Sequence, residues 1–417
     1  MSLDTSGIPL PGAAPRGREL IASLGNGSFR VFLASQFFAT MALWGQRIAT
    51  DWVLLEMTGS VTLVGMLVVF QFGPTLLLGM WGGVLVDRYS TKLLLLASQI
   101  AALLVNIGVA VLALTGALSP FAIFAAVTVL GLFSIVDQPA RQVVVGFIVG
   151  DAKLGNAISM NQITYQVAGM IGPVVAGVML VSPGSGAVFV VASIAHALAL
   201  VTLAWTFVKA RLAPPIPHEQ HRGEIADAFR YAWRKPEIRY TMILLVFVCV
   251  VGLNWPLVFV SMATMEFHSG AEGYGYANAA IAAGSLVGGI LSLRRVHRGL
   301  STVIVGIGGL SAFRVICGVA PVEWIYLIVV AGTGVWSLLM WTAANSLLQW
   351  SSNTHIRGRI MSLYMLIAVG GQALGGPLLG WACEVFGPRA VFIVSGLIPL
   401  AATFVILALA RRERRGR

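Results

Sequence analysis

Charged residues are scarce in this chain. Only 10% of its 417 residues are Asp, Glu, Lys or Arg, whereas 58% are hydrophobic. An ordinary globular protein carries about 25% charged residues. This chain has too little polar surface to cover a soluble body of its size, so a conventional soluble protein is excluded. The composition predicts an all-α integral membrane protein.

Cysteine clusters, an N-terminal apolar segment and phosphate-binding loops are also lacking. Cys249, Cys317 and Cys383 stand singly in apolar segments, which is neither a disulfide framework nor a metal-ligand spacing. The first 28 residues contain no apolar core, so we expect no cleaved signal peptide. The absence of a G-x-x-x-x-G-K-[ST] motif argues against a self-contained ATP-driven pump. We therefore expect no metal, no cofactor and no enzymatic activity.

Apolar runs long enough to cross a bilayer recur along the whole sequence. Twelve transmembrane helices are predicted, at about 31–56, 61–85, 93–115, 119–139, 156–181, 186–208, 240–264, 273–293, 301–320, 324–348, 360–382 and 390–410. They divide the chain into a cytoplasmic tail (1–30), a six-helix half (31–208), a cytoplasmic linker (209–239), a second six-helix half (240–410) and a basic tail (411–417).

The basic residues are sorted to one side of this topology. The net charge is +11, and all Lys and Arg residues except Arg47, Arg314 and Arg389 lie in loops, tails or helix ends of the same side. Because positive charge stays in the cytoplasm, both termini are predicted there, in the cell inner (plasma) membrane. This placement indicates a bilayer, not nucleic acid, as the partner. The linker segment "IADAFRYAWRKPEIRY" predicts a short amphipathic helix on the cytoplasmic face.

Two short patterns repeat between the halves. "GGVL" at 82–85 returns as "GGIL" at 288–291, and the Pro173 segment "GMIGPVVAG" returns 204 residues later as the Pro377 segment "ALGGPLLG". Each match joins the same helix of each half in the same orientation. Two pseudo-symmetric halves related by an axis along the membrane normal are typical of transporters whose substrate site lies between the halves.

A loop motif connects the chain to a known family. "GGVLVDRYSTK" matches G-x-x-x-D-R-x-x-x-[RK] at Gly83, Asp87, Arg88 and Lys92. The motif resembles the cytoplasmic loop signature of the major facilitator superfamily, and the resemblance extends over essentially the whole chain. It implies that Asp87 engages Arg141 and the helix beginning near Ile360, which would join the halves on the cytoplasmic side and favour the outward-open state.

Further segments resemble an exporter subgroup. "GMIGPVVAG" is similar to the G-P-x-x-G signature of proton-driven exporters, although three residues separate the proline from the last glycine; the residues involved are Gly169, Gly172, Pro173 and Gly177. Glycine-rich helix packing without a mechanistic role is the alternative. "DQPARQ" and "IRGRIMSLYML" resemble the subgroup of enterobactin exporters and secretion-type efflux proteins, which borders on multidrug pumps and lysophospholipid flippases. No substrate-specific signature is present.

Amide and aromatic residues concentrate in the helices that line the cavity in this superfamily. The predicted substrate-cavity residues are Gln36, Gln71, Asn161, Gln162, Tyr165, Gln166, Asn254, Trp255, Asn278, Trp341, Asn345 and Gln372. This mixture suits an amphipathic organic molecule. For any single amide, hydrogen bonding between helices is an equally good reading.

Few titratable groups lie within the predicted spans. They are Asp51, Asp137 and His196, and of these His196 is on a peripheral helix. Asp137 is predicted near the cytoplasmic end of its span, where it can pair with Arg141. Asp51 is the preferred proton carrier, with Arg47 on the same helix face. At 1.5 Å per residue they lie about 30 Å and about 24 Å along the helix, in its outer half. An ion pair that merely eases insertion is the alternative.

These features predict a monomeric, proton-coupled antiporter that exports a small amphipathic compound, such as a drug or siderophore, by alternating access. A lysophospholipid flippase or an uptake porter of the same fold is the alternative within transport. A non-transporting membrane assembly or sensor protein is the alternative from another class.

Overall fold

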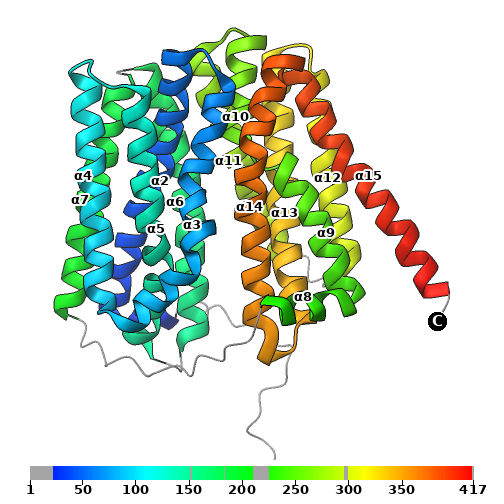
Figure 1. Ribbon diagram of the computed structural model, residues 1–417, viewed down its shortest axis with the longest axis horizontal. Coiled ribbons are helices and arrows are strands. Elements are labelled where there is room, and N and C mark those ends of the chain that lie inside the picture. Colours follow the sequence, from blue (N-terminus) through cyan, green and yellow to red (C-terminus); the bar gives the residue numbers. More distant parts are fainter. Residues whose placement is uncertain (1–21, 151–152, 183, 210–224, 295–298, 416–417) are drawn as a thin grey trace, which may run out of the picture.

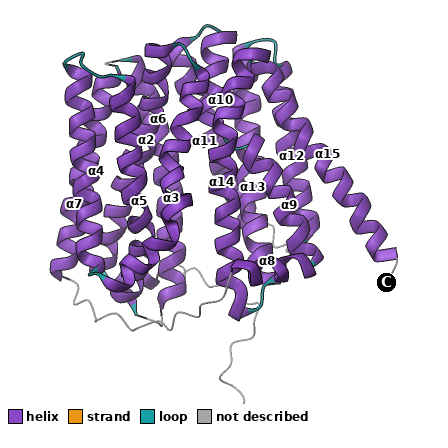
Figure 2. Cartoon of the chain, viewed as in Figure 1, coloured by secondary structure: helices purple, strands orange, loops and turns teal. Residues whose placement is uncertain are grey.

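The computed structural model describes residues 22–150, 153–182, 184–209, 225–294 and 299–415. These ranges contain helices and short loops but no strand (Figure 2). The first half comprises η1 (Ala22–Gly25), α2 (Gly27–Thr58), α3 (Val61–Arg88), α4 (Thr91–Leu114), α5 (Pro120–Val149), α6 (Leu154–Val181) and α7 (Ser185–Lys209). The second half comprises α9 (Pro236–Val251), α10 (Trp255–Ser261), the π-helical turn η3 (Met262–Glu266), α11 (Gly270–Arg294), α12 (Leu300–Val319), α13 (Glu323–Ser351), α14 (Thr354–Phe386) and α15 (Pro388–Arg415).

The long helices run side by side between two faces (Figure 1). The start of α2, the end of α15 and the short helix α8 (Ile225–Arg234) lie at one face, here called the terminal face. The loops that join α2 to α3 and α14 to α15 lie at the other, here called the opposite face. Helix α8 falls within the linker for which the sequence predicts an amphipathic helix.

Eleven helical segments in the described ranges are long and apolar enough to cross a membrane. The remaining long helix, α2, is outside that set, and the count of twelve spans stays a prediction. Helix α2 carries Arg47 and Asp51, and about half of its 32 residues are buried against other helices. Because its polar residues face protein, α2 does not need a uniformly apolar sequence.

The structure corrects the predicted position of Asp137. The predicted span ends at residue 139, whereas α5 continues to Val149, and Asp137 therefore lies about 18 Å before the helix end at 1.5 Å per residue. Asp137, Pro139 and Arg141 all lie inside this helix. Arg141 is 2% exposed and is not a loop residue.

The structure also corrects the predicted continuous span at 240–264. Helix α9 ends at Val251, and α10 begins at Trp255. Proline has no backbone N–H and its ring clashes with the carbonyl four residues earlier. Pro256 therefore cannot donate to the Gly252 carbonyl the hydrogen bond that would continue helix α9. A proline also disfavours helical geometry at the preceding residue. The seventh span is therefore a broken helix.

The repeat predicted from "GGVL" and "GGIL" has a structural basis. Gly82 of α3 lies against the backbone of Ile135 on α5, with no space for a side chain. Gly288 of α11 lies in the same way against Val335 on α13. Each glycine lets the second helix of its half approach the fourth, which supports the two pseudo-symmetric halves.

The hydrophobic cores show where the halves meet. One cluster draws buried side chains from both halves near the opposite face, including Leu54 and Phe259. Toward the terminal face the clusters are separate, one around Phe32 in the first half and one around Leu245 in the second. The halves therefore share a core at the opposite face and keep their own cores at the terminal face.

Glycines close the joint at the opposite face. Gly65 on α3 packs against Gly376 on α14, and Gly177 on α6 packs against Gly275 on α11, in both cases with no room for a Cβ atom. Beside them, the rings of Trp52 on α2 and Tyr274 on α11 stack at a centroid distance of 6.2 Å. The α3–α14 and α6–α11 pairs thus seal this face.

Candidate functional site

A small recess of about 10 Å³, enough for about one water molecule, lies between α2, α3 and α5 inside the first half. Its polar lining comes from two helices, in the form of Gln46, Arg47, Thr50, Asp51 and Gln71. Helix α2 supplies four of them because residues three and four apart share a helix face. The remaining lining is aliphatic, so a small set of polar groups faces an otherwise apolar wall.

Arg47 has more than one partner in this recess. Its Nη1 atom donates a hydrogen bond of 2.5 Å to Oε1 of Gln71 on α3. Its Nε atom lies 3.8 Å from a carboxylate oxygen of Asp51, too far for a hydrogen bond. The guanidinium also lies 5.6 Å from the centre of the Phe72 ring, in cation–π range. Gln71 thus holds Arg47 in place while Asp51 remains loosely paired.

Gln46 is an unusual member of the lining. It is 2% exposed, and neither its amide nitrogen nor its amide oxygen has a hydrogen-bond partner in the described part of the chain. Leaving buried polar atoms unpaired costs about 1–3 kcal/mol per group. The recess therefore suits a polar occupant, such as a water molecule, that would bond to Gln46.

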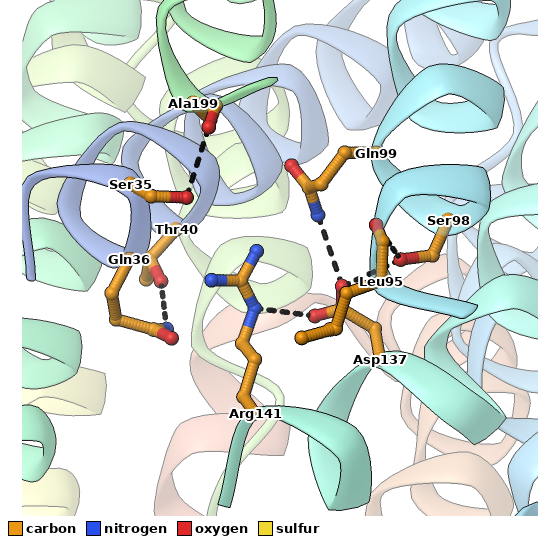
Figure 3. Close-up of polar contacts among 9 residues, drawn as sticks. All are labelled: Ser35, Gln36, Thr40, Leu95, Ser98, Gln99, Asp137, Arg141 and Ala199. Atoms are coloured by element: carbon orange, nitrogen blue, oxygen red, sulfur yellow. Dashed lines mark hydrogen bonds and ion pairs between the residues drawn. The ribbon is translucent and has the colours of Figure 1, made fainter. Parts of the chain in front are cut away.

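Asp137 belongs to a different, tightly bonded cluster between α4 and α5 (Figure 3). Nε of Arg141 donates to its carboxylate at 2.8 Å, Ser98 Oγ donates at 2.7 Å and Gln99 Nε2 donates at 3.0 Å. The predicted Asp137–Arg141 pair is confirmed. Ser98 and Gln99 project from α4 toward α5, so both helices secure the carboxylate.

The donors of Arg141 are only partly used. Its two terminal nitrogens are buried without a hydrogen-bond partner in the described ranges. Nearby on α2, Gln36 donates to Thr40 of its own helix at 2.9 Å (Figure 3). Gln36 and Asp137 thus lie in the half of the helices nearer the terminal face, whereas Asp51 lies nearer the opposite face. The structure does not bring the predicted coupling residues into one site.

Several predicted cavity amides bond within the second half. Asn278 donates to the carbonyl of Tyr274 at 2.8 Å, one turn earlier on α11. Asn254 donates to the carbonyl of Gln372 at 3.2 Å, which joins the break in the seventh span to α14. These contacts show helix packing, and a role for the same residues in substrate binding stays a prediction.

Other predicted cavity residues have different surroundings. On α6, Gln162 and Gln166 are exposed, whereas Asn161 and Tyr165 are half-buried. In the second half the half-buried Trp341 ring packs edge to face against Tyr364 at a centroid distance of 5.4 Å, the Trp255 ring packs against Phe259 at 5.8 Å, and Asn345 accepts a hydrogen bond from Gln349. Substrate contact by any of these residues stays a prediction.

The loop motif is described in part. Gly83 and Asp87 lie in α3, but the Asp87 side chain is outside the described part of the chain, so its expected contact with Arg141 stays a prediction. Arg88 and Lys92 are exposed at the terminal face, and the Lys92 ammonium lies 5.9 Å from the centre of the Phe207 ring.

The glycine-rich motif of α6 serves close packing on both of its sides. Gly172 lies against the backbone of Met41 on α2, and Gly169 lies against the Trp44 ring. Pro173 lies inside α6, and Gly177 forms part of the joint with α11. The motif thus connects the helix that carries Asp51 with the interface between the halves.

Sequence reasoning missed a carboxylate at the opposite face. Glu384 near the end of α14 accepts hydrogen bonds from Ser60 Oγ at 2.8 Å, from the Thr62 backbone N–H at 2.9 Å and from Thr62 Oγ1 at 2.6 Å. The acid of one half thus caps the first turn of α3 in the other half. An acidic residue at a helix end is visible in the sequence, but its partner more than 300 residues away is not.

The chain was compared with known proteins. A family model described as transmembrane secretion effector matches residues 19–415. The enterobactin exporter EntS of Citrobacter koseri is 27% identical over 397 residues, which cover 94% of this chain and 93% of the relative. The staphyloferrin A transporter of Staphylococcus aureus is 22% identical over 392 residues, which cover 92% and 96%.

Solved structures share the fold at lower sequence identity. A POT family transporter in complex with a thioalcohol-conjugated peptide superposes with a TM-score of 0.73 at 13% identity, covering 92% of this chain and 96% of that one. The nucleoside transporter NupG gives a TM-score of 0.69 at 13% identity, covering 91% and 99%. These are transporters, not enzymes. The chain is a multi-pass membrane transporter of the major facilitator superfamily, and it belongs to the transmembrane secretion effector family.

Proposed function

We propose that this transporter exports a small amphipathic compound of the siderophore class in exchange for protons, by alternating access. The observation that supports export is the match of almost the whole chain to relatives named as an enterobactin exporter and a staphyloferrin A transporter. The two six-helix halves, 31–208 and 240–410, would move as units within a monomer. The predicted cavity residues, a mixture of amide and aromatic side chains, would suit a substrate with apolar rings and polar edges.

The terminal face is proposed to lie in the cytoplasm of the cell inner membrane. Arg88 and Lys92 are exposed at that face, and so is Arg234 of α8. At the opposite face, Arg389 is instead paired with Glu266 at 2.5 Å. The positive-inside rule assigns the basic face to the cytoplasm. With this orientation, the shared core near the opposite face would make the described conformation closed to the outside.

Asp51 is the proposed proton carrier. In the described part of the chain its carboxylate has one cationic neighbour at 3.8 Å and receives no hydrogen bond. Protonation therefore breaks no hydrogen bond to this group, whereas protonation of Asp137 would disturb three. The position of Asp51 in a recess with an unpartnered amide gives water a place to deliver the proton.

Asp51 is also placed to influence the joint between the halves. The next residue, Trp52, stacks on Tyr274 of the second half. The Tyr274 hydroxyl is buried without a hydrogen-bond partner among the described residues. A change in charge at Asp51 would therefore occur next to Trp52. The contact of Trp52 with Tyr274 must separate when the opposite face opens.

Transport in proteoliposomes tests this function. Enterobactin and staphyloferrin A would be measured as substrates, with a lysophospholipid and a fluorescent drug as comparisons. We expect substrate movement against its gradient when a pH gradient is imposed, and loss of that drive in Asp51→Asn. The matched control is Glu56→Gln, which removes an exposed carboxylate from the same helix.

The outcomes separate the alternatives. Movement of the substrate that ignores the pH gradient would refute proton antiport while leaving transport intact. Movement of the lysophospholipid alone would indicate a flippase, and accumulation in the direction of the proton gradient would indicate an uptake porter. The absence of movement for every compound, with folded protein, would favour a membrane assembly or sensor protein.

A further inference from the structure

Arg314 is a buried cation without an acidic partner in the described part of the chain. It lies on α12, is 1% exposed and is the largest fully buried side chain there. A charged group at this depth requires compensation from its surroundings. The groups that contact the Arg314 cation therefore indicate its role.

Backbone carbonyls at the end of α9 supply much of this compensation. Nη1 of Arg314 donates to the carbonyl of Gly252 at 2.8 Å, and Nη2 donates to the carbonyl of Val251 at 3.2 Å. The last carbonyls of a helix have no partner within it, and they carry the negative end of the helix dipole. The Arg314 cation therefore satisfies both the hydrogen-bonding and the electrostatic requirements of the α9 terminus.

Three more side chains contact the guanidinium group. Ser395 Oγ on α15 accepts from Nη2 at 2.7 Å and lies 3.1 Å from Nε. The plane lies 4.5 Å from the centre of the Trp255 ring and 5.2 Å from that of Phe392. Trp255 is the first residue of α10. One side chain thus contacts the end of α9 and the beginning of α10, on either side of the break.

The break is also held from the side of α14. Asn254 in the break donates to the Gln372 carbonyl, and Gly375 of α14 lies against the backbone of Val250 with no room for a side chain. Residues 252–254 are therefore enclosed between α12 and α15 on one side and α14 on the other. The break is a built feature of the second half, in which Arg314 satisfies the carbonyls of Val251 and Gly252.

The two segments joined by the break contact different parts of the protein. Helix α9 packs against α12, α13, α14 and α15 within its own half. Helix α10 also contacts α2 and α3 of the first half. Its residues Leu257, Val258 and Phe259 belong to the core shared by both halves. The outer part of the seventh span is therefore part of the joint at the opposite face, whereas α9 reaches the shared core only in its last turn, through Val250 and Val251.

We propose that Arg314 is a positioning residue for alternating access, which fixes the break in the seventh span and so sets the orientation of α10 against the first half. When the opposite face opens, α10 turns relative to α9 about residues 252–254, and Arg314 keeps the pivot hydrogen-bonded. The inference rests on the transporter fold and on these contacts. It does not depend on proton coupling or on Asp51.

The test measures the opening of the joint directly. A cysteine introduced as Leu379→Cys reports on the shared core, because Leu379 is 5% exposed there. Its reaction with a membrane-impermeant maleimide would be followed in proteoliposomes, and the protein without it gives the background from the three buried native cysteines. Arg314→Met keeps an unbranched apolar chain up to about the position of Nε but removes the donors and the charge. We expect it to increase the labelling rate about fivefold or more, as the closed population falls.

Measurements of substrate binding and of transport distinguish a positioning role of Arg314 from a role in folding. For Arg314→Met we expect the substrate Kd in detergent to stay within about twofold, while the transport rate per folded protein falls about tenfold. Arg314→Lys retains the charge and donors and should restore part of the closed population. A purely structural role would lower the unfolding temperature and leave both the labelling rate and the rate per folded protein unchanged.

A milder variant covers the case in which Arg314→Met does not fold. Ser395→Ala removes one anchor of the guanidinium while leaving its bonds to the α9 carbonyls, and we expect about a twofold increase in Leu379→Cys labelling. Wild-type labelling in both Ser395→Ala and Arg314→Met would overturn the proposal. If Arg314→Met does not fold, wild-type labelling in Ser395→Ala alone would overturn it. Because labelling needs no pH gradient, this result is independent of the antiport mechanism.

Discussion

Two pairs of opposite charge, each spaced by four residues, lie in the first half of the transporter. On α5, Asp137 and Arg141 are joined by a 2.8 Å hydrogen bond, and α4 donates two more hydrogen bonds to the same carboxylate. On α2, Arg47 and Asp51 approach only to 3.8 Å, and Arg47 donates instead to Gln71. The same spacing thus produces one fully bonded carboxylate and one loosely paired carboxylate.

The neighbouring helices account for this difference. Helix α4 directs two donors at Asp137, whereas α3 directs an acceptor at Arg47 and draws the guanidinium away from Asp51. A buried carboxylate with several charge-assisted hydrogen bonds is firmly held as part of the packing. A buried carboxylate without them is free to change its proton with little structural cost. The comparison assigns a structural role to Asp137 and the proposed coupling role to Asp51.

Asp137→Asn should have the largest effect on stability. The substitution leaves Arg141 charged and buried without its partner, which costs about 3–5 kcal/mol. The unfolding temperature in detergent would measure the loss, and Asp51→Asn is the matched control because Arg47 keeps its bond to Gln71. Equal losses in the two variants would remove the distinction between the sites.

Asp51→Asn should have the largest effect on coupling while the protein stays folded. We expect gradient-driven transport to fall about tenfold or more, while substrate counterflow, which needs no net proton movement, continues. The ratio of the two rates in proteoliposomes is the measurement. Glu56→Gln should leave the ratio unchanged, and an unaffected ratio in Asp51→Asn would place the proton elsewhere.

Glu384 extends the comparison to a carboxylate whose donors come from the other half. Glu384→Gln removes the negative charge that accepts three hydrogen bonds at the start of α3. We expect a loss of about 1–2 kcal/mol from the closed state, which corresponds to about a tenfold change in its population relative to the open state. Maleimide labelling of Leu379→Cys would detect the shift. Glu272→Gln, an exposed acid at the same face, is the control and should label at the wild-type rate.

Ser98→Ala should have the smallest effect. It removes one of three hydrogen bonds from Asp137 and leaves the ion pair intact, so we expect a loss of about 1 kcal/mol in unfolding free energy and full proton coupling. Thermal unfolding and gradient-driven transport would be measured on the same preparation. Loss of coupling with little loss of stability would show that the Asp137 cluster, and not the Asp51 recess, carries protons.

Much of the fold follows from local patterns in the sequence. Hydropathy identifies eleven of the long helices, and the repeated glycine patterns indicate two related halves. The predicted span 31–56 lies within α2, although α2 is outside the eleven sufficiently apolar segments because it carries polar residues that are buried against other helices. The break in the seventh span has a visible cause in Pro256, but an apolar run on both sides makes the span look continuous.

The candidate site was less predictable. The four-residue spacings predict both charged pairs, because residues one turn apart share a helix face. The sequence contains no information on which helix lies opposite, so the donors from Ser98 and Gln99 and the bond from Arg47 to Gln71 could not be foreseen. For the same reason the sequence places Arg314 within a predicted span but does not identify its partners, which include carbonyls of another span.

Proton release on substrate binding tests the central assignment most directly. Substrate would be added to purified transporter in weakly buffered detergent solution, and the pH change would be followed with an indicator dye. The account predicts proton release by the wild-type protein and by Ser98→Ala, and none by Asp51→Asn at saturating substrate. Undiminished release from Asp51→Asn would contradict the assignment of Asp51 as the proton carrier.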